Sequence, residues 1–139
     1  MNTAVFRYLR GDRQDAFRLF KEILDVDADH MQAVFNLALM YQNGEGVKQD
    51  EAKAFELYER AHRAGHEGST CNLGMMYMKG VGVRQNKEKG FELLQQAHTA
   101  GHADATFNVA ASYDNGDGVK QDKAKTYVFS NSKLERILF

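Results

Sequence analysis

Residues 36–57 read NLALMYQNGEGVKQDEAKAFEL, residues 72–93 read NLGMMYMKGVGVRQNKEKGFEL, and residues 108–129 read NVAASYDNGDGVKQDKAKTYVF. Each copy begins 36 residues after the previous one. A fixed period of this length is typical of stacked helical repeats, in which each unit buries its apolar face against its neighbours. The repetition therefore predicts an all-α fold built as a solenoid.

Each copy predicts two antiparallel helices joined by a glycine-rich turn. In the first copy, apolar residues recur with helical spacing over 33–43, and Gly44 is the expected left-handed C-cap. Asp50 is the expected N-cap of a second helix over 51–64, which Gly65 ends. The corresponding residues of the later copies are Gly80, Asn86, Gly101, Gly116 and Asp122. Small residues at 38, 74 and 110 predict that the helices approach closely there.

We expect about four helix pairs in one repeat domain, with units 1–29, 30–65, 66–101 and 102–139. The first unit is a divergent N-terminal cap, in which Ala4, Phe6 and Leu9 suggest one helix and AFRLFKEIL suggests the next. The last unit is expected to end in a C-terminal capping helix. Its apolar residues either cover the last core face or protrude, as a dimer contact or as the start of further repeats. These residues are Leu134, Ile137, Leu138 and Phe139.

Composition excludes several classes of partner. The chain has 139 residues, with 18 basic and 19 acidic side chains and a net charge of −1, so nothing favours nucleic acid or an anionic membrane. No apolar run is long enough to cross a bilayer, and the first residues lack the pattern of a signal peptide. The single cysteine, Cys71, cannot form an intrachain disulfide. We expect a cytoplasmic protein.

The repeated residues resemble the Sel1-like repeat family, which is related to the tetratricopeptide repeat. The resemblance covers residues 31 to about 129 and includes the N-L-G-x-M-Y, G-x-G-V and G-H segments. The N-terminal unit is closer to a tetratricopeptide repeat. The resemblance implies a right-handed superhelix of antiparallel helix pairs, with adaptor or scaffold function, often in bacteria. Gly90 and Thr126 depart from the family's usual alanine, which Ala54 supplies.

The asparagines that open the three copies are candidate binding residues. In such a stack, the first helix of each unit lines the concave surface. Asn36, Asn72 and Asn108 fall at the edge of the buried face, where an amide could bond both polar groups of an extended peptide backbone. The resembling tetratricopeptide arrays use asparagines in this way. The alternative is that each asparagine bonds the neighbouring helix or a buried water and orders the stack, and the two roles are compatible.

Apolar residues beside the asparagines complete the predicted groove. Met75 and Met78 are expected to be exposed in it, as a flexible strip suited to adaptable binding, whereas Met76 matches Met40 and is expected in the core. The filling of gaps between repeats is the alternative for the strip. The candidate peptide-binding or partner-binding set is Asn36, Asn72, Asn108, Phe35, Leu39, Met75, Met78 and Phe107.

Other kinds of site find little support in the sequence. The histidines at 62 and 66, and at 98 and 102, are separated by Gly65 and Gly101, so they need not share a face, and no metal is expected. The G-x-G-V turns follow helices and lack the lysine of a phosphate-binding loop, so no nucleotide or other cofactor is expected. Cys71 matches Phe35 and Phe107 and is read as a small hydrophobe. No catalytic residues and no enzyme activity are predicted.

These observations lead to one expected function and one alternative. The expected function is that of a protein–protein interaction adaptor or scaffold, which binds a peptide or partner domain in its concave groove. The alternative is a homo-oligomeric structural module that assembles through the apolar C-terminal segment.

Overall fold

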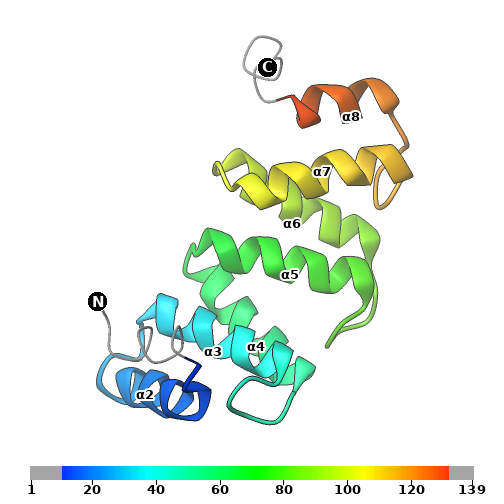
Figure 1. The fold of residues 1–139 in the computed structure, drawn as a ribbon. Coiled ribbons are helices and arrows are strands. Elements are labelled where there is room, and N and C mark those ends of the chain that lie inside the picture. The colour runs from blue at the N-terminus through cyan, green and yellow to red at the C-terminus, as the bar shows by residue number, and fades with distance from the viewer. Residues whose placement is uncertain (1–10, 132–139) are drawn as a thin grey trace. The chain divides into compact units, whose positions relative to one another are not determined.

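The computed structural model describes residues 11–131, and each regular element in that range is a helix (Figure 1). The helices are α2 (Arg13–Val26), α3 (Met31–Asn43), α4 (Glu51–Arg63), α5 (Glu67–Lys79), α6 (Lys87–Thr99), α7 (Ala103–Asn115) and α8 (Lys123–Ser130). The helix expected around Ala4, Phe6 and Leu9 lies outside the described residues. The expected capping segment with Leu134, Ile137, Leu138 and Phe139 also lies outside them.

The helices alternate between two types along the chain. We call α3, α5 and α7 A-type helices, because each begins a copy of the repeat, and α2, α4, α6 and α8 B-type helices. The chain divides into two compact units, with the boundary between Ser69 and Thr70. The first unit contains α2, α3, α4 and the first residues of α5, and the second contains the rest of α5 with α6, α7 and α8.

The B-type helices start where the repeated acidic or amide residue predicts. Asp50 accepts a hydrogen bond from the backbone N–H of Lys53 at 3.0 Å. Asn86 and Asp122 do the same for the residues three positions later, at 3.1 Å and 3.0 Å. Each cap satisfies one of the N–H groups that a helix start leaves without a partner. The three predicted N-caps are confirmed.

A glycine and a glutamine together cap the C-terminal end of the A-type helices. Gly44 and Gly116 have φ angles of 67° and 73°, which confirms the predicted left-handed caps. The glutamine five residues after each glycine folds back and donates to a carbonyl of the last helical turn. These bonds join Gln49 to Gln42, Gln85 to Met78 and Gln121 to Asp114, at 2.7, 2.8 and 2.7 Å. The repeated glutamine therefore has a structural role that the sequence pattern did not predict.

The second glycine of each turn allows a close approach between backbones. In the first unit, Gly46 lies so close to the carbonyl of Arg13, at the start of α2, that any Cβ would clash with it. In the second unit, Gly118 has the same relationship to Lys87, at the start of α6. A glycine is required at these positions both for its positive φ and for the space.

An ion pair accompanies each of these close approaches. The Arg13 guanidinium lies 2.6 Å from the Glu45 carboxylate, and the Lys87 ammonium lies 2.9 Å from the Asp117 carboxylate. In both cases the acidic residue directly precedes the second glycine of the turn. All four side chains are partly exposed, so each pair contributes at most about 1 kcal/mol. Each of these turns thus contacts the preceding B-type helix through a close backbone approach and an ion pair.

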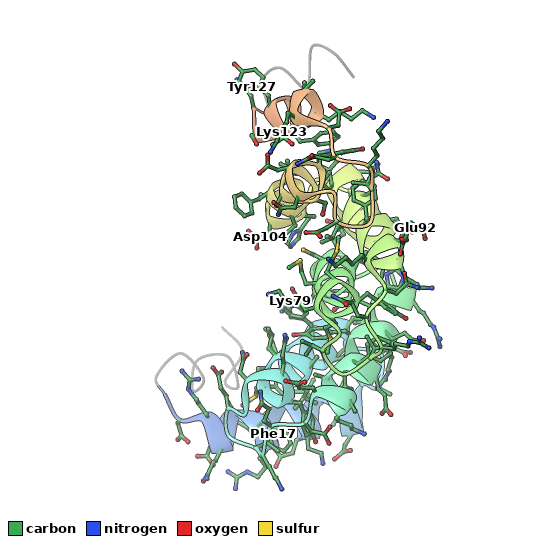
Figure 2. All side chains as sticks on the ribbon, turned by 90° about the vertical axis from the view of Figure 1, so that its right-hand side faces the viewer. Phe17, Lys79, Glu92, Asp104, Lys123 and Tyr127 are labelled. Carbon is green, nitrogen blue, oxygen red and sulfur yellow. The ribbon has the colours of Figure 1, made fainter. Side chains whose placement is uncertain are left out.

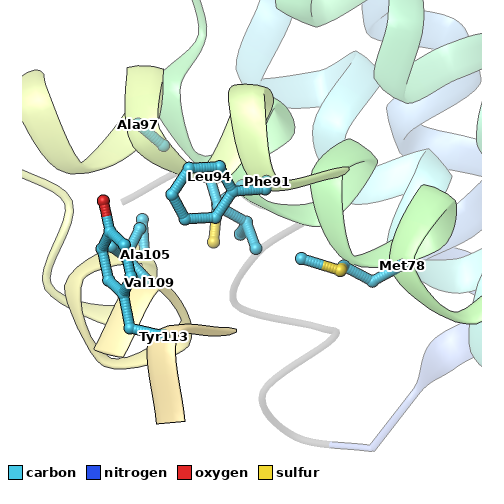
Figure 3. Packing of buried hydrophobic residues seen from close by; sticks show 8 residues of the cluster. Met78, Phe91, Leu94, Ala97, Ala105, Val109 and Tyr113 are labelled. Carbon is cyan, nitrogen blue, oxygen red and sulfur yellow. The ribbon is translucent and has the colours of Figure 1, made fainter. Parts of the chain in front are cut away.

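Each unit has its own apolar core. In the first unit, Phe20 of α2 packs with Leu37 and Met40 of α3, and Val47 of the turn packs against the same cluster. In the second unit, Phe91 and Leu94 of α6 face Val109 and Tyr113 of α7 (Figure 3). The rings of Phe91 and Tyr113 meet edge to face with centroids 5.3 Å apart. Val47 and the equivalent Val119, the apolar residues of the two turns, are partly buried against these cores.

Candidate partner-binding surface

The three asparagines lie on the A-type helices, and all are half-buried. Their hydrogen bonds differ from one copy to the next. Asn36 accepts a long bond of 3.4 Å from Gln32 on its own helix, and Asn108 bonds the thiol of Cys71. The amide of Asn72 makes no hydrogen bond within residues 11–131. Within the described residues, the three amides therefore do not share one hydrogen-bonding pattern.

Cys71 lies beside Asn72 and behaves as a core residue. Its side chain is 2% exposed and belongs to the apolar cluster of the second unit. Burial raises the pKa of the thiol above 9.0, its ordinary value, and the negative charge of Asp104 raises it further. The hydrogen bond with Asn108 has a smaller, opposite effect. Since a raised pKa keeps the sulfur protonated at neutral pH, Cys71 lacks the thiolate that a nucleophile requires.

The predicted methionine strip is only partly present at the surface. Met75 is half-buried and packs against the core of the second unit. Met78, which was expected to be exposed, is 9% exposed and belongs to that core, and its Cγ lies against Gly90 of α6. The expectation for Met78 is wrong because α6 has no side chain at position 90, and the methionine fills the space. Met40 and Met76 are buried, as predicted.

Two phenylalanines at equivalent positions have different surroundings. Phe35 is half-buried, and its ring packs against Tyr58 and His66 with centroids at 5.9 and 4.8 Å. Phe107 is 74% exposed. An exposed large aromatic side chain is a common feature of interaction surfaces, although a single one is not sufficient to define a surface. Leu39, one turn after Phe35, is half-buried.

The second unit presents several of these residues on one side. Cys71, Asn72, Met75 and Lys79 are spaced to share a face of α5, and Asp104, Phe107, Asn108 and Ala111 are spaced to share a face of α7. Figure 2 shows Lys79 and Asp104 on the same side of this unit, and Glu92 on the opposite side. The sequence pattern does not single out Asp104, although the 36-residue period places it at the position of Gln32.

The histidines act mainly at the junctions between helix pairs. The Nδ1 atoms of His30 and His66 accept hydrogen bonds from the N–H groups of Ala33 and Ser69, so both residues cap the A-type helix that follows. His102 occupies the same position but makes no such bond. Within the described part of the chain, no three His, Cys, Asp or Glu side chains are grouped so that they could hold a metal ion. None of the helices in residues 11–131 has the length and apolar character needed to cross a membrane.

Known proteins share both the repeat and the fold. The Sel1 repeat model matches residues 32–66, 69–102 and 103–127. A crystal structure of a Sel1 repeat protein from Oxalobacter formigenes superimposes with a TM-score of 0.85 and 26% sequence identity, over 95% of this chain and 53% of that one. A protective antigen from uropathogenic Escherichia coli strains, which displays an SLR fold, gives a TM-score of 0.82 and 29% identity, over 96% and 29% of the two chains.

The chain spans about half the length of the first of these proteins and less than a third of the second. No curated protein shows significant similarity to the chain. The repeat matches nevertheless cover more than half of the sequence, and the all-α fold class predicted from the 36-residue period is confirmed. The three repeat copies, their capped helix pairs and the shared fold establish that the chain belongs to the Sel1 repeat family.

Proposed function

We propose that this chain is a protein-interaction module that binds an extended peptide segment on the face that α5 and α7 present in the second unit. Sel1 repeats are commonly protein–protein interaction modules and are typically scaffolds without enzyme activity. The observation that supports the proposal most directly is the half-buried amide of Asn72, which has no hydrogen-bond partner within the described residues. A half-buried amide with unused donors and an unused acceptor is suited to pair with a peptide backbone.

The surroundings of Asn72 fit the same role. Met75 follows one helical turn later and is partly exposed above the core of the second unit. On α7, Phe107 offers an exposed ring and Asn108 a second half-buried amide. Polar groups that fix a peptide backbone, placed beside apolar surfaces that receive its side chains, are the usual composition of a peptide-binding surface. In the first unit, Asn36, Phe35 and Leu39 form the corresponding set.

A selection of random peptides on the purified protein tests this function. Peptides that bind the wild type should lose about 1–2 kcal/mol of binding free energy with Asn72→Ala, the scale of a hydrogen bond whose partner is left unpaired. Gln96→Ala, which removes an exposed amide one turn after Glu92 on α6, is the matched control and should leave the affinity unchanged. Unchanged peptide affinity together with a lower melting temperature for Asn72→Ala would show that the amide is structural and would contradict the proposal.

One observation favours a second candidate function, homo-oligomeric assembly at the end of the chain. Phe17 and Phe91 occupy the same position in their B-type helices, and each meets a tyrosine of the following A-type helix edge to face. The equivalent residue of α8, Tyr127, is 64% exposed and points outward (Figure 2). The equivalent aromatic residues of α2 and α6 each contact the next helix, whereas Tyr127 of α8 is exposed. The apolar face of another copy could cover Tyr127.

Light scattering coupled to size-exclusion chromatography separates the two functions. The interaction module is expected to stay monomeric across a hundredfold range of concentration and to retain its peptide affinity when Tyr127 is changed to Ser. A concentration-dependent dimer that disappears with Tyr127→Ser, or on deletion of residues 131–139, would favour the oligomeric alternative.

A further inference from the structure

Two residues of α3 in the first unit hold a histidine ring from the start of the next repeat. The Nε2 of His66 lies 3.2 Å from Oε1 of Gln32, and its ring packs on that of Phe35 with centroids 4.8 Å apart and an angle of 37° between the planes. Gln32 and Phe35 are three residues apart on one helix, so their side chains lie next to each other. Gln32 therefore bonds the edge of the His66 ring, and the ring of Phe35 packs against it.

The hydrogen bonds identify the atom of His66 that donates. The backbone N–H of Ser69 donates to Nδ1 of His66 at 3.2 Å, so Nδ1 is an acceptor and the ring proton is on Nε2. Nε2–H therefore donates to the amide oxygen of Gln32. The Gln32–Phe35 pair is thus a binding site for a planar N–H donor, and the chain itself fills it.

The positions of Gln32 and Phe35 recur on α7, where an aspartate replaces the glutamine and no histidine follows at the position of His66. Seventy-two residues after Gln32 and Phe35, at twice the repeat period, the chain has Asp104 and Phe107. Asp104 is exposed and forms no ion pair within the described residues, and Phe107 is 74% exposed. The position equivalent to His66 is Leu138, which lies outside the described residues and whose side chain has no N–H group.

The change from glutamine to aspartate alters what such a site would bind. A carboxylate accepts hydrogen bonds only and is negatively charged, so it favours a donor that is also a cation. Among side chains, the arginine guanidinium is a flat cation with N–H groups at its edge, which matches both a carboxylate and an aromatic face. A lysine ammonium has the charge but not the flat shape. Asp104 lies on the same side of the second unit as Lys79 of α5 (Figure 2), and its negative charge raises the pKa of Cys71 of α5.

We propose that Asp104 and Phe107 form a binding site for an arginine side chain of a partner peptide. The guanidinium donates to the Asp104 carboxylate at its edge and packs against the Phe107 ring, in the way that the tilted His66 ring packs against Phe35. Asn108 follows Phe107 directly and is half-buried, so it is placed to bond the backbone beside that arginine. The inference rests on the proposed function and adds one chemical requirement to the ligand, an arginine that reaches α7.

The test is an NMR titration of the full chain with three blocked tripeptides. Acetyl-Gly-Arg-Gly-amide should shift the backbone amides of residues 104–108 most strongly. The lysine peptide should bind more weakly, and the peptide with uncharged citrulline should bind most weakly. Asp104→Asn and Phe107→Ala should each weaken the arginine peptide by about fivefold, the upper range for a single exposed contact. Glu92→Gln, an exposed carboxylate on the opposite side of the unit, should change nothing.

Two results would overturn the inference. The first is equal shifts with the citrulline peptide, and the second is an unchanged affinity in Asp104→Asn with an unchanged melting temperature. If selected peptides depend on Asn72 but not on arginine or Asp104, the inference fails and the proposed function stands. If the arginine peptide binds at Asp104 while the affinity of selected peptides is unchanged by Asn72→Ala, the inference stands and the proposed function of Asn72 in peptide binding fails.

Discussion

Gly74 of α5 and Gly90 of α6 pack directly against each other. A Cβ added to Gly90 would lie 2.8 Å from the carbonyl oxygen of Gly74 and 2.8 Å from Cγ of Met78. The other two helix pairs have alanine or threonine at the position of Gly90, namely Ala54 and Thr126. The pairing of two glycines is therefore specific to this helix pair, and it explains why Met78 is buried and not exposed at the surface.

The Gly90→Ala substitution should destabilise the chain although alanine favours helix. The gain in helix propensity is about 1 kcal/mol, and an added methyl group in a filled core costs about 1–3 kcal/mol. We expect a net loss of up to about 2 kcal/mol in the free energy of unfolding, measured by urea denaturation. Thr126→Ala, at the equivalent half-buried position of α8, is the control and should cost less than about 1 kcal/mol. Equal effects at the two positions would show that the contact with Gly74 is unimportant.

A pair of glycine substitutions separates backbone conformation from close packing. Gly101 and Gly118 have φ angles of 93° and 72°, so alanine at either position has a left-handed conformation that costs about 1–2 kcal/mol. Only Gly118 also lies against the carbonyl of Lys87, whereas a Cβ at Gly101 would meet no atom within 4 Å. Gly118→Ala should therefore lower the free energy of unfolding by about 1–3 kcal/mol more than Gly101→Ala, the typical cost of overpacking. Similar melting temperatures for the two variants would contradict the close approach.

The three residues of the Lys120-Gln121-Asp122 segment should contribute differently to stability. Asp122→Ala removes the N-cap of α8 and should cost about 1 kcal/mol. Gln121→Ala removes the bond to the Asp114 carbonyl and should cost about 0.5–1.5 kcal/mol. Lys120 is exposed, and Lys120→Ala should stay within about 0.5 kcal/mol of the wild type. Chemical denaturation of the three variants checks the order, and a loss confined to Lys120→Ala would contradict the assignment.

The raised pKa of Cys71 predicts slow thiol labelling in the folded protein. Since the thiolate is the reactive form, modification by iodoacetamide at pH 8 should be much slower than in the protein unfolded by urea. Asp104→Asn removes the charge that adds to the effect of burial on the pKa and should accelerate the reaction, whereas Glu92→Gln should not. Equal labelling rates for folded and unfolded protein would contradict the burial of the thiol.

The same shift gives the direction of a pH dependence. Because the pKa of Cys71 is higher in the folded state than in the unfolded state, the stabilising contribution of this group is fully present below the ordinary thiol value of 9.0. It is lost as the pH rises through the folded-state pKa. A Cys71→Ala variant should therefore lose less stability than the wild type between pH 8 and pH 10, as measured by thermal unfolding. The same alkaline loss in both proteins would show that other groups are responsible.

Much of the fold is predictable from the repeat, because the features that specify it are local. The N-caps at Asp50, Asn86 and Asp122 and the left-handed Gly44 and Gly116 depend on the conformation of a few adjacent residues. The repeated glutamines were harder to predict, since a glutamine bonds a carbonyl seven residues earlier only after the turn has formed. The sequence alone indicates only that the second glycine of each turn allows a flexible backbone. The close approach of Gly46 to the carbonyl of Arg13 shows why a glycine is required there.

The candidate surface is less predictable than the fold. Equivalent residues have the same helical position, but their exposure depends on the element that packs over them, and this differs between copies. Phe35 is covered by His66 and Tyr58, whereas Phe107 is exposed. Periodicity alone predicts the same surroundings for both.

The sequence by itself determined the repeat type, the helix pairs with their caps, and the position of the asparagines at the edge of the buried face. These follow from hydrogen bonds and apolar spacing within about ten residues along the chain. The tertiary structure decided that Met78 is buried, that the amide of Asn72 makes no hydrogen bond within residues 11–131, and that Phe107 is exposed, as Asp104 is. These outcomes depend on side chains from other helices, whose size and contacts are not contained in the local sequence.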